Sequence, residues 1–301
     1  MEWLIQGSES PGGDTLESKN NTIRKRLKVF FNRGALSVIS FIVLSLFILV
    51  AIFAPLITRY SPYEQNVSQK YASSSADHPF GTDKLGRDIL TRLAYGARIS
   101  LLASLLSSMV AAVIGLVLGL IAGFFKGFIS QLIMRIADAE LSIPPLVLTL
   151  VLSLLFGDGV FGVVMVIGIS LVPTYIRLVY GLVLSQKKND FVLAAKLIGQ
   201  SNSIIIIKHI LPNCFPSLIV LFTMNLGTAM MLEASMSYLG IGIVPPTPTW
   251  GGMVSESYEV LILHPMQAIL PGICIMLVVV AFNILGDGLR DALDPRLRGK
   301  L

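Results

Sequence analysis

Residues 99–125 read ISLLASLLSSMVAAVIGLVLGLIAGFF and contain no charged side chain. About 20 apolar residues are enough for an α-helix to cross the ~30 Å hydrocarbon core of a bilayer. A helix is the favoured structure for such a run, because it pairs its backbone hydrogen-bonding groups within the segment. The sequence therefore predicts a transmembrane helix over this run.

Five further apolar runs flank this one. They cover residues 36–57, which also lack a charge, and about residues 129–156, 160–184, 217–244 and 266–285. The run at 129–156 is the weakest, because it contains charged residues and a Pro-Pro pair. All five are continuous and long enough to span a bilayer. We therefore expect an all-α, polytopic membrane protein with six transmembrane helices.

The composition of the whole chain points the same way. Its 301 residues are 54% hydrophobic and 14% charged, with a mean hydropathy of +0.76, whereas a soluble domain carries about 25% charged residues. No basic patch interleaved with aromatic residues occurs, so nucleic acid is not an expected partner. Cys214 and Cys274 are far apart in the sequence, which disfavours a zinc site or a disulfide framework. The expected surroundings of the chain are membrane lipid.

The distribution of Lys and Arg predicts the orientation in the membrane. With the N-terminus inside, the inner segments hold most of the 23 Lys and Arg residues. The Lys and Arg residues assigned to the outer side all lie within residues 58–98. Lys and Arg concentrate on the cytoplasmic side of membrane proteins. We therefore expect both termini to be cytoplasmic, in the inner or plasma membrane.

This orientation divides the chain into four parts. They are a flexible cytoplasmic tail (1–35), the first transmembrane helix with an outer segment (36–98), a five-helix core (99–286) and a second cytoplasmic tail (287–301). In the outer segment, Thr82 or Asp83 is expected to cap a helix whose apolar positions are Ile89, Leu90 and Leu93. The arginines that follow are expected to face water, lipid headgroups or acidic partners; they are Arg87, Arg92 and Arg98.

One inner loop, residues 185–216, contains a short predicted helix. Asn189 or Asp190 is expected to cap it, and Gly199 is expected to end it in a left-handed turn. Its apolar residues at helical spacing are Phe191, Ala194, Ala195 and Ile198. This stripe can rest on lipid as an interfacial helix, or its small Ala-Ala face can dock a protein. The residues alone leave both alternatives open.

Charged residues inside the apolar runs are the candidates for a polar path. Glu233, Arg177 and Asp138 lie within predicted helices, with Glu140 close to Asp138. A charge in the membrane is costly, so it should face the bundle interior or a water-filled cavity. The functional hypothesis is a translocation path or gate. The alternatives are an interhelical polar bond and contact with headgroups from a helix end.

Small residues predict how one helix packs. Gly115, Gly119, Gly123 and Gly127 recur at every fourth position and so lie along one ridge of a helix. Such a ridge lets a second helix approach closely. We expect a tight helix pair along it.

The chain carries no motif for chemistry of its own. It contains no GxxxxGK[ST] phosphate loop, no HExxH and no GxSxG pattern. His78, His209 and His264 lie in three different segments and make a poor metal triad. We therefore expect this chain to be neither an enzyme nor the holder of a cofactor or metal. The clustered catalytic groups that a membrane-embedded enzyme needs are absent from the sequence.

The 185–216 loop resembles the EAA loop of permeases in ATP-binding cassette (ABC) importers. The matching positions are Ala194, Ala195 and Gly199 and, in the closing HxLPN pattern, His209, Leu211, Pro212 and Asn213. Leu193 stands where the motif usually has Glu, so no salt bridge is expected from this position. The apolar docking face is kept.

Two further segments narrow the resemblance to one family. Residues 78–100, HPFGTDKLGRDILTRLAYGARIS, are similar to the outer segment of the dipeptide/oligopeptide/nickel permease family. Residues 233–257, EASMSYLGIGIVPPTPTWGGMVSES, resemble the fifth helix and outer loop of that family. The likeness spans about residues 30–301.

The resemblance implies a type I ABC-importer permease fold with a cytoplasmic coupling helix. It implies four partners: a homologous second permease, two ATPase subunits that bind ATP and Mg, and an extracytoplasmic substrate-binding protein. ATP binding would move the 190–200 helix as a lever in an alternating-access cycle. The implied substrates are di- or oligopeptides, with nickel or metal chelates as the alternative. A secondary transporter is less favoured, because no convincing inverted repeat is visible.

Overall fold

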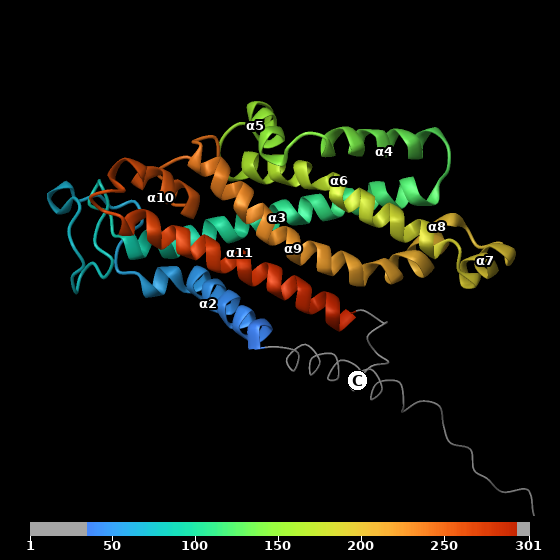
Figure 1. Cartoon of the computed structure of the whole chain (residues 1–301), viewed down its shortest axis with the longest axis horizontal. Helices are drawn as coiled ribbons and strands as arrows, with labels where there is room; N and C mark the ends of the chain where they lie inside the picture. Colours follow the sequence, from blue (N-terminus) through green and yellow to red (C-terminus); the bar gives the residue numbers. More distant parts are fainter. Residues whose placement is uncertain (1–34, 294–301) are drawn as a thin grey trace, which may run out of the picture.

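The computed structural model describes residues 35–293 and shows an elongated bundle of helices (Figure 1). The tails predicted for residues 1–35 and 287–301 fall largely outside the described residues. Between residues 35 and 293 the chain forms no strand, and its extended pairing is limited to an isolated bridge between Thr82 and Asp88. The expected all-α class is confirmed.

Within the described range, five helices are long and apolar enough to cross a membrane. They are α2 (Ala35–Ile57), α3 (Ile89–Phe124), α6 (Val160–Gln186), α9 (Leu211–Tyr238) and α11 (Met266–Leu293). α9 continues α8 (Asn202–Ile204) through a π-helical segment (Ile205–Ile210), so a single rod runs over Asn202–Tyr238. Each of these helices contains one of the predicted runs or most of it.

The run at 129–156 forms two helices, so the prediction of one continuous helix there is wrong. α4 (Phe128–Leu141) and α5 (Pro145–Phe156) meet at an angle of 105°. Pro144 has φ −55° and ψ 132°, the extended conformation favoured by a residue that precedes a proline. Pro145 then begins α5, where its missing N–H costs nothing. Counted as one bent span, the pair is the sixth.

α3 begins at Ile89, earlier than the start predicted at residue 99. Asp88 is its N-cap, because its carboxylate accepts a hydrogen bond from the Thr91 N–H at 2.8 Å. The sequence assigned this role to Thr82 or Asp83, and that assignment is wrong. The cap carries the helix beyond its apolar run into a stretch with charged residues.

Three of the four spaced glycines join α3 to α6. The contacts are Gly115 with Tyr175, Gly119 with Val179, and Gly123 with Val183. A Cβ on Gly119 would lie 2.6 Å from the Val179 Cβ, which is too close for two carbon atoms. Gly127 takes no part in the ridge and instead precedes α4. The predicted tight pair is therefore confirmed over three of its four positions.

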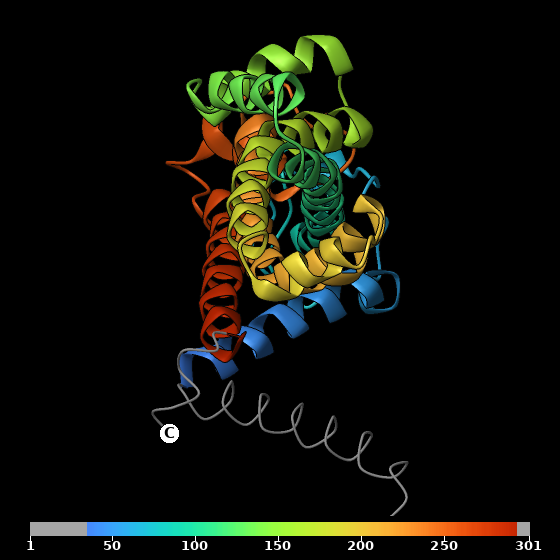
Figure 2. The ribbon, with the colours of Figure 1, turned by 90° about the vertical axis from the view of Figure 1, so that its right-hand side faces the viewer.

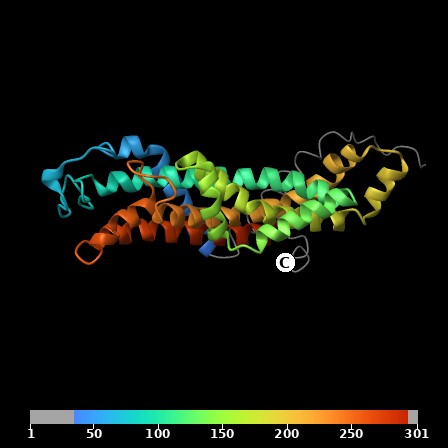
Figure 3. The same cartoon turned by 90° about the horizontal axis from the view of Figure 1, so that it is seen from above.

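The remaining helices surround this pair (Figure 2). α3, α6 and α9 contact one another, α11 and α2 pack beside them, and α4 and α5 pack on α6. α10 (Trp250–Ser257) lies at one end of the long axis, against α9 and α11. α7 (Asp190–Leu197) lies at the opposite end, as Figure 3 also shows. We call these the α10 end and the α7 end.

Candidate functional site

The loop at the α7 end is built around a short helix with favourable charges. Asp190 stands in the first turn of α7 and Lys196 in the last, where each charge suits the helix dipole. Asn189 precedes the helix, and its side-chain amide donates to Gln186 Oε1 at 2.9 Å. Asn189 therefore makes no side-chain cap, in contrast to one of the two sequence expectations.

A glycine ends this helix. Gly199 has φ +76°, a left-handed conformation that glycine adopts without a Cβ clash. The Gln200 N–H then bonds to the Ala195 carbonyl at 3.1 Å, which satisfies one of the free carbonyls at the helix end. The helix end predicted from Gly199 is observed.

The two faces of α7 differ in burial. Val192 and Ala195 are buried in one apolar cluster that also contains Ile205 and Ile210. The predicted stripe is only partly right, because Ala195 packs inward while its other members are exposed. The exposed apolar residues of this helix and its end are Phe191, Leu193, Ala194, Leu197 and Ile198, which we call the α7 surface.

The α7 surface is strongly exposed for an apolar one. Leu197 is 81% exposed and Ile198 is 74% exposed. Leu193, at the position of the motif's usual Glu, adds a further exposed apolar side chain. Apolar side chains gathered on one exposed helix mark a contact site for a protein or for lipid.

The closing half of the loop holds α7 in place. His209 Nε2 lies 2.9 Å from Gln200 Oε1, directly after the helix end. The rings of His209 and Phe191 lie 6.4 Å apart, inclined at 40°. The structure thus brings the two halves of the motif together across the loop.

The same half of the loop leads into α9. Leu211 and Pro212 form the first turn of that helix, where a proline is well tolerated. Asn213 Nδ2 donates to the His209 carbonyl at 2.7 Å. These residues make the loop continuous with α9, one of the helices long enough to cross a membrane.

Arg177 and Asp138 form an ion pair between α6 and α4. Arg177 Nη2 lies 2.6 Å from Asp138 Oδ1, and the two side chains are 54% and 42% exposed. This is the interhelical polar bond that the sequence offered as the alternative to a path. Both residues lie in the half of the bundle towards the α7 end.

Glu233 lies in the other half, near the α10 end of α9. It is fully buried, and its Oε1 accepts a hydrogen bond from Ser237 Oγ at 2.9 Å. Ser100 of α3 and Thr249 before α10 also lie near the carboxyl group. Its Oε2 has no hydrogen-bond partner among residues 35–293. The structure therefore does not bring Glu233, Arg177 and Asp138 together, and their role in a path stays a prediction.

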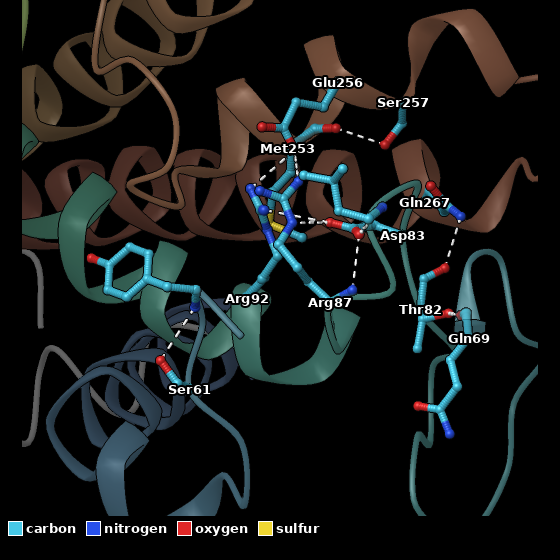
Figure 4. A network of polar contacts seen from close by, with 12 residues as sticks. Ser61, Gln69, Thr82, Asp83, Arg87, Arg92, Met253, Glu256, Ser257 and Gln267 are labelled. Carbon is cyan, nitrogen blue, oxygen red and sulfur yellow. Dashed lines mark hydrogen bonds and ion pairs between the residues drawn. The ribbon is translucent and has the colours of Figure 1, made fainter. Parts of the chain in front are cut away.

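Four charged side chains fasten the α10 end (Figure 4). Arg87 Nε lies 2.5 Å from Asp83 Oδ2, and Arg87 Nη2 lies 2.6 Å from Glu256 Oε2. Arg92 contacts the same two carboxylates, at 3.0 Å to Glu256 and 3.4 Å to Asp83. Both arginines are only 2% exposed. We call these four residues the α10 latch.

The latch joins the segment before α3 to α10. Burial raises the pKa of the Glu256 carboxyl above its ordinary value, and the neighbouring Arg87 guanidinium partly lowers it again. Nearby, Gln267 Nε2 of α11 donates to the Thr82 carbonyl at 3.1 Å. The segment 78–100 is thus tied to two elements from the far end of the sequence.

Sequence reasoning missed the latch. Of the three surroundings expected for the arginines, only acidic partners are found at Arg87 and Arg92, whereas Arg98 is exposed. Glu256 is 169 positions from Arg87, so no local spacing reveals the pair. The signal available was that residues 58–98 hold the outer Lys and Arg residues, while the stretch 233–257 that resembles the family's outer loop contains Glu256.

The three histidines have separate neighbours. His78 contacts Asp88 and Gln69, His209 contacts Gln200, and His264 stacks on Tyr71. From residue 35 to residue 293, no group of three His, Cys, Asp or Glu side chains is placed to hold a metal. The expectation that the chain itself binds no cofactor stays a prediction.

Two sequence families match the chain. The family described as "Binding-protein-dependent transport system inner membrane component" matches residues 115–299, which include the α7 surface. The family described as "N-terminal TM domain of oligopeptide transport permease C" matches residues 30–73, which include α2. Together they cover both ends of the bundle.

Curated relatives and a solved structure agree with these matches. The dipeptide transport system permease protein DppC of Alkalihalophilus pseudofirmus is 42% identical over 266 residues, or 88% of each chain. The glutathione transport system permease protein GsiD of Shigella flexneri is 42% identical over 273 residues, or 89% of each chain. A chain of the inward-facing MetNI methionine ABC transporter matches with a TM-score of 0.57 and 18% identity, over 67% of this chain and 96% of that one. This last likeness concerns the fold.

Proposed function

Because the chain belongs to the family of binding-protein-dependent transport system inner membrane components, we propose that this permease subunit carries di- or oligopeptides. Support comes from relatives named for dipeptide and glutathione transport, since glutathione is itself a tripeptide. Nickel or metal chelates are the alternative cargo. The remaining partners of the proposed assembly are a homologous second permease, two ATPase subunits and an extracytoplasmic substrate-binding protein.

The α7 surface is the observation that supports an importer permease coupled to ATPase subunits. Five apolar side chains stand exposed on a helix whose other face is already buried against its own loop. Lipid is a poor occupant for this surface, because it lies at the tip of the long axis, beyond the ends of α6 and α9 (Figure 3). An ATPase subunit that covers the α7 surface would remove Leu197 and Ile198 from water and connect ATP hydrolysis to the bundle.

The proposed orientation follows from this assignment. The α7 end faces the cytoplasm, where the ATPase subunits bind ATP and Mg, and the α10 end faces the binding protein. Both termini are then cytoplasmic, in agreement with the excess of Lys and Arg in the segments assigned to the inside. A cysteine-labelling scan with a membrane-impermeant reagent tests it. Labelling of Leu263→Cys and not Leu197→Cys in intact cells is expected, and the reverse pattern contradicts the orientation.

The proposed transport cycle is alternating access. Closure of the ATPase pair displaces α7, and the bundles of the two permeases switch the side on which their shared path is open. Glu233 is enclosed in the present conformation, so a path that includes it must be uncovered by movement of α10 or α3. Transport by Glu233→Gln and Glu233→Ala tests this point. Near-unaltered uptake and assembly in both variants would remove Glu233 from the path.

Reconstitution tests the function itself. The chain is combined with its second permease, its ATPase subunits and its binding protein in vesicles, and ATP hydrolysis is scored against peptides and metal chelates. Stimulation by di- or oligopeptides supports the proposal, and stimulation by nickel chelates alone supports the alternative cargo. Uptake by the chain without ATPase subunits, driven by a proton or sodium gradient, would overturn the importer reading.

A further inference from the structure

The α7-end terminus of α3 is held by a lysine from outside the helix. Lys187, directly after α6, donates from Nζ to the Phe124 carbonyl at 2.7 Å and to the Gly123 carbonyl at 3.3 Å. The last carbonyls of a helix have no partner within it, and a cation there is doubly favourable. This contact fixes the end of α3 to the point where the chain leaves α6 for the loop.

A second lysine reaches the same place from α7. Lys196 Nζ lies 5.7 Å from the centroid of the Phe124 ring, and Lys187 Nζ lies 5.2 Å from it. Both distances fit a cation over an aromatic face. Phe124 is buried, whereas Lys196 is exposed. The ring is therefore fixed in the bundle, and the lysine belongs to α7, the helix proposed to dock an ATPase subunit. We call Phe124, Lys187 and Lys196 the α3 clamp.

The electrostatics of the clamp are strained by like charges. Burial lowers the pKa of the Lys187 ammonium, and the positive charges of Lys196 and Lys126 lower it further. Two ammonium groups that repel each other nevertheless lie over one ring. The negative face of the ring and the carbonyls of α3 offset the repulsion.

α3 leads from the clamp to the opposite end of the molecule. Its middle is packed on α6 through the glycine ridge, whose glycines lie against Tyr175, Val179 and Val183. At its other end, Arg92 holds Glu256 of α10, and Trp250 Nε1 donates to the Leu93 carbonyl at 3.0 Å. A displacement of Phe124 is therefore passed along a continuous rod to α10.

We infer that Phe124 is a positioning residue through which α7 moves α3, with Lys196 as the link from the docking helix and Lys187 as the anchor. The inference rests on the proposed function, because it takes α7 to be the element that the ATPase subunits move. The clamp then couples ATP hydrolysis at the α7 end to the position of α10. The binding protein would contact the bundle at that end and so respond to this position. Lys196 is the informative residue, because Lys187 alone already satisfies the end of α3.

The test uses the complete reconstituted importer and measures ATP hydrolysed per peptide imported. Lys196→Met is expected to raise this ratio about threefold, the size of a weak cation–π contact, while co-purification of the ATPase subunits is unchanged. Lys196→Arg keeps a cation over the ring and is expected to restore the unaltered ratio. In a Phe124→Leu background, which keeps an apolar side chain, Lys196→Met is expected to add nothing.

The matched control is Lys188→Met, which removes an exposed lysine of the same loop. An unaltered ratio in the control supports the clamp. A rise equal to that of Lys196→Met would overturn it, because the loss of any positive charge from the loop would then have the same effect. An unaltered ratio in Lys196→Met, or an equal effect with and without Phe124, also overturns the clamp. Failure of the proposed function is distinguishable, because the unaltered complex would then show no hydrolysis stimulated by peptides or by metal chelates, and the clamp would be overturned with it.

Discussion

The two ends of the bundle differ in how their side chains are satisfied. At the α10 end, three buried charged residues and the partly buried Glu256 are bonded to one another across 169 positions of sequence. At the α7 end, a short helix buries one face on its own loop and leaves Leu197 and Ile198 largely in solvent. The first end is satisfied within the chain, and the second presents a surface that the chain itself does not cover.

The difference shows which substitutions should affect folding and which should affect function. A buried charge that loses its partner cannot return to water, so damage at the α10 end is expressed as lost stability. An exposed apolar side chain contributes little to folding, so damage at the α7 end is expressed as lost association. α3 connects the two, because the latch holds one of its ends and the α3 clamp holds the other.

The largest effect is expected at the latch. Arg87→Met leaves Glu256 and Asp83 with Arg92 as their remaining latch partner, and should cost about 3–5 kcal/mol of unfolding free energy. Thermal and denaturant unfolding in detergent micelles measures it. Arg98→Met is the control, since Arg98 is an exposed arginine of α3, and it should change stability by less than about 0.5 kcal/mol. Equal effects of the two substitutions would contradict a latch.

A smaller effect is expected where α3 meets α6. Gly119→Ala places a Cβ 2.6 Å from the Val179 Cβ and should cost about 1–3 kcal/mol, because the two helices must separate. Gly181→Ala in α6 is the matched control, since nothing lies within 4 Å of its added Cβ. There the change should be neutral or stabilising by up to about 1 kcal/mol. Coincident unfolding curves for Gly119→Ala and Gly181→Ala would contradict the tight packing of α3 on α6.

At the α7 end, stability and association should separate. Leu197→Asp removes an exposed apolar side chain from the α7 surface, so the free energy of unfolding should stay within about 0.5 kcal/mol. The affinity for the ATPase subunits should fall about tenfold, the equivalent of losing part of one buried leucine. Titration binding measurements, with Leu197→Met as the control, check this. Unaltered affinity in Leu197→Asp would contradict a docking role.

Ala195→Asp is less informative, because Ala195 is buried and its loss disturbs the loop itself.

The smallest effect is expected at the end of α7. Gly199→Ala forces a side chain into a conformation with φ +76° and should cost about 1 kcal/mol, confined to the loop. Asn tolerates this conformation better, so Gly199→Asn should lie between Ala and the unaltered chain. The ratio of ATP hydrolysed to peptide imported should follow the same order. An order in which Asn is worse than Ala would contradict the left-handed cap.

The sequence was sufficient for features that depend on neighbouring residues. Apolar runs predict membrane helices, because burial in lipid depends on the composition of one segment. The glycine spacing predicts the α3–α6 contact, and Gly199 predicts a helix end, because both follow from local backbone geometry. The start of α3 was missed, since Asp88 lies outside the apolar run and its cap depends on Thr91.

Features that depend on distant residues could not be predicted. Glu256 and Arg87 meet only after the chain has folded, and the same holds for Lys196 and Phe124. The buried face of α7 was predicted only in part. Val192, and not Ala194, packs against Ile205 of the following segment, and this contact depends on how the loop folds back. The break at Pro144 was also missed, since a proline pair can kink a membrane helix as well as divide it.

Hydrogen exchange of the whole chain, alone and with its ATPase subunits, tests the contrast between the two ends most directly. Amides of residues 190–200 are expected to become protected when the ATPase subunits are added. Amides of residues 83–92 and of α10 are already slow and should change much less. Unchanged exchange at residues 190–200 in a complex that still co-purifies would contradict the claim that the α7 surface is the docking site.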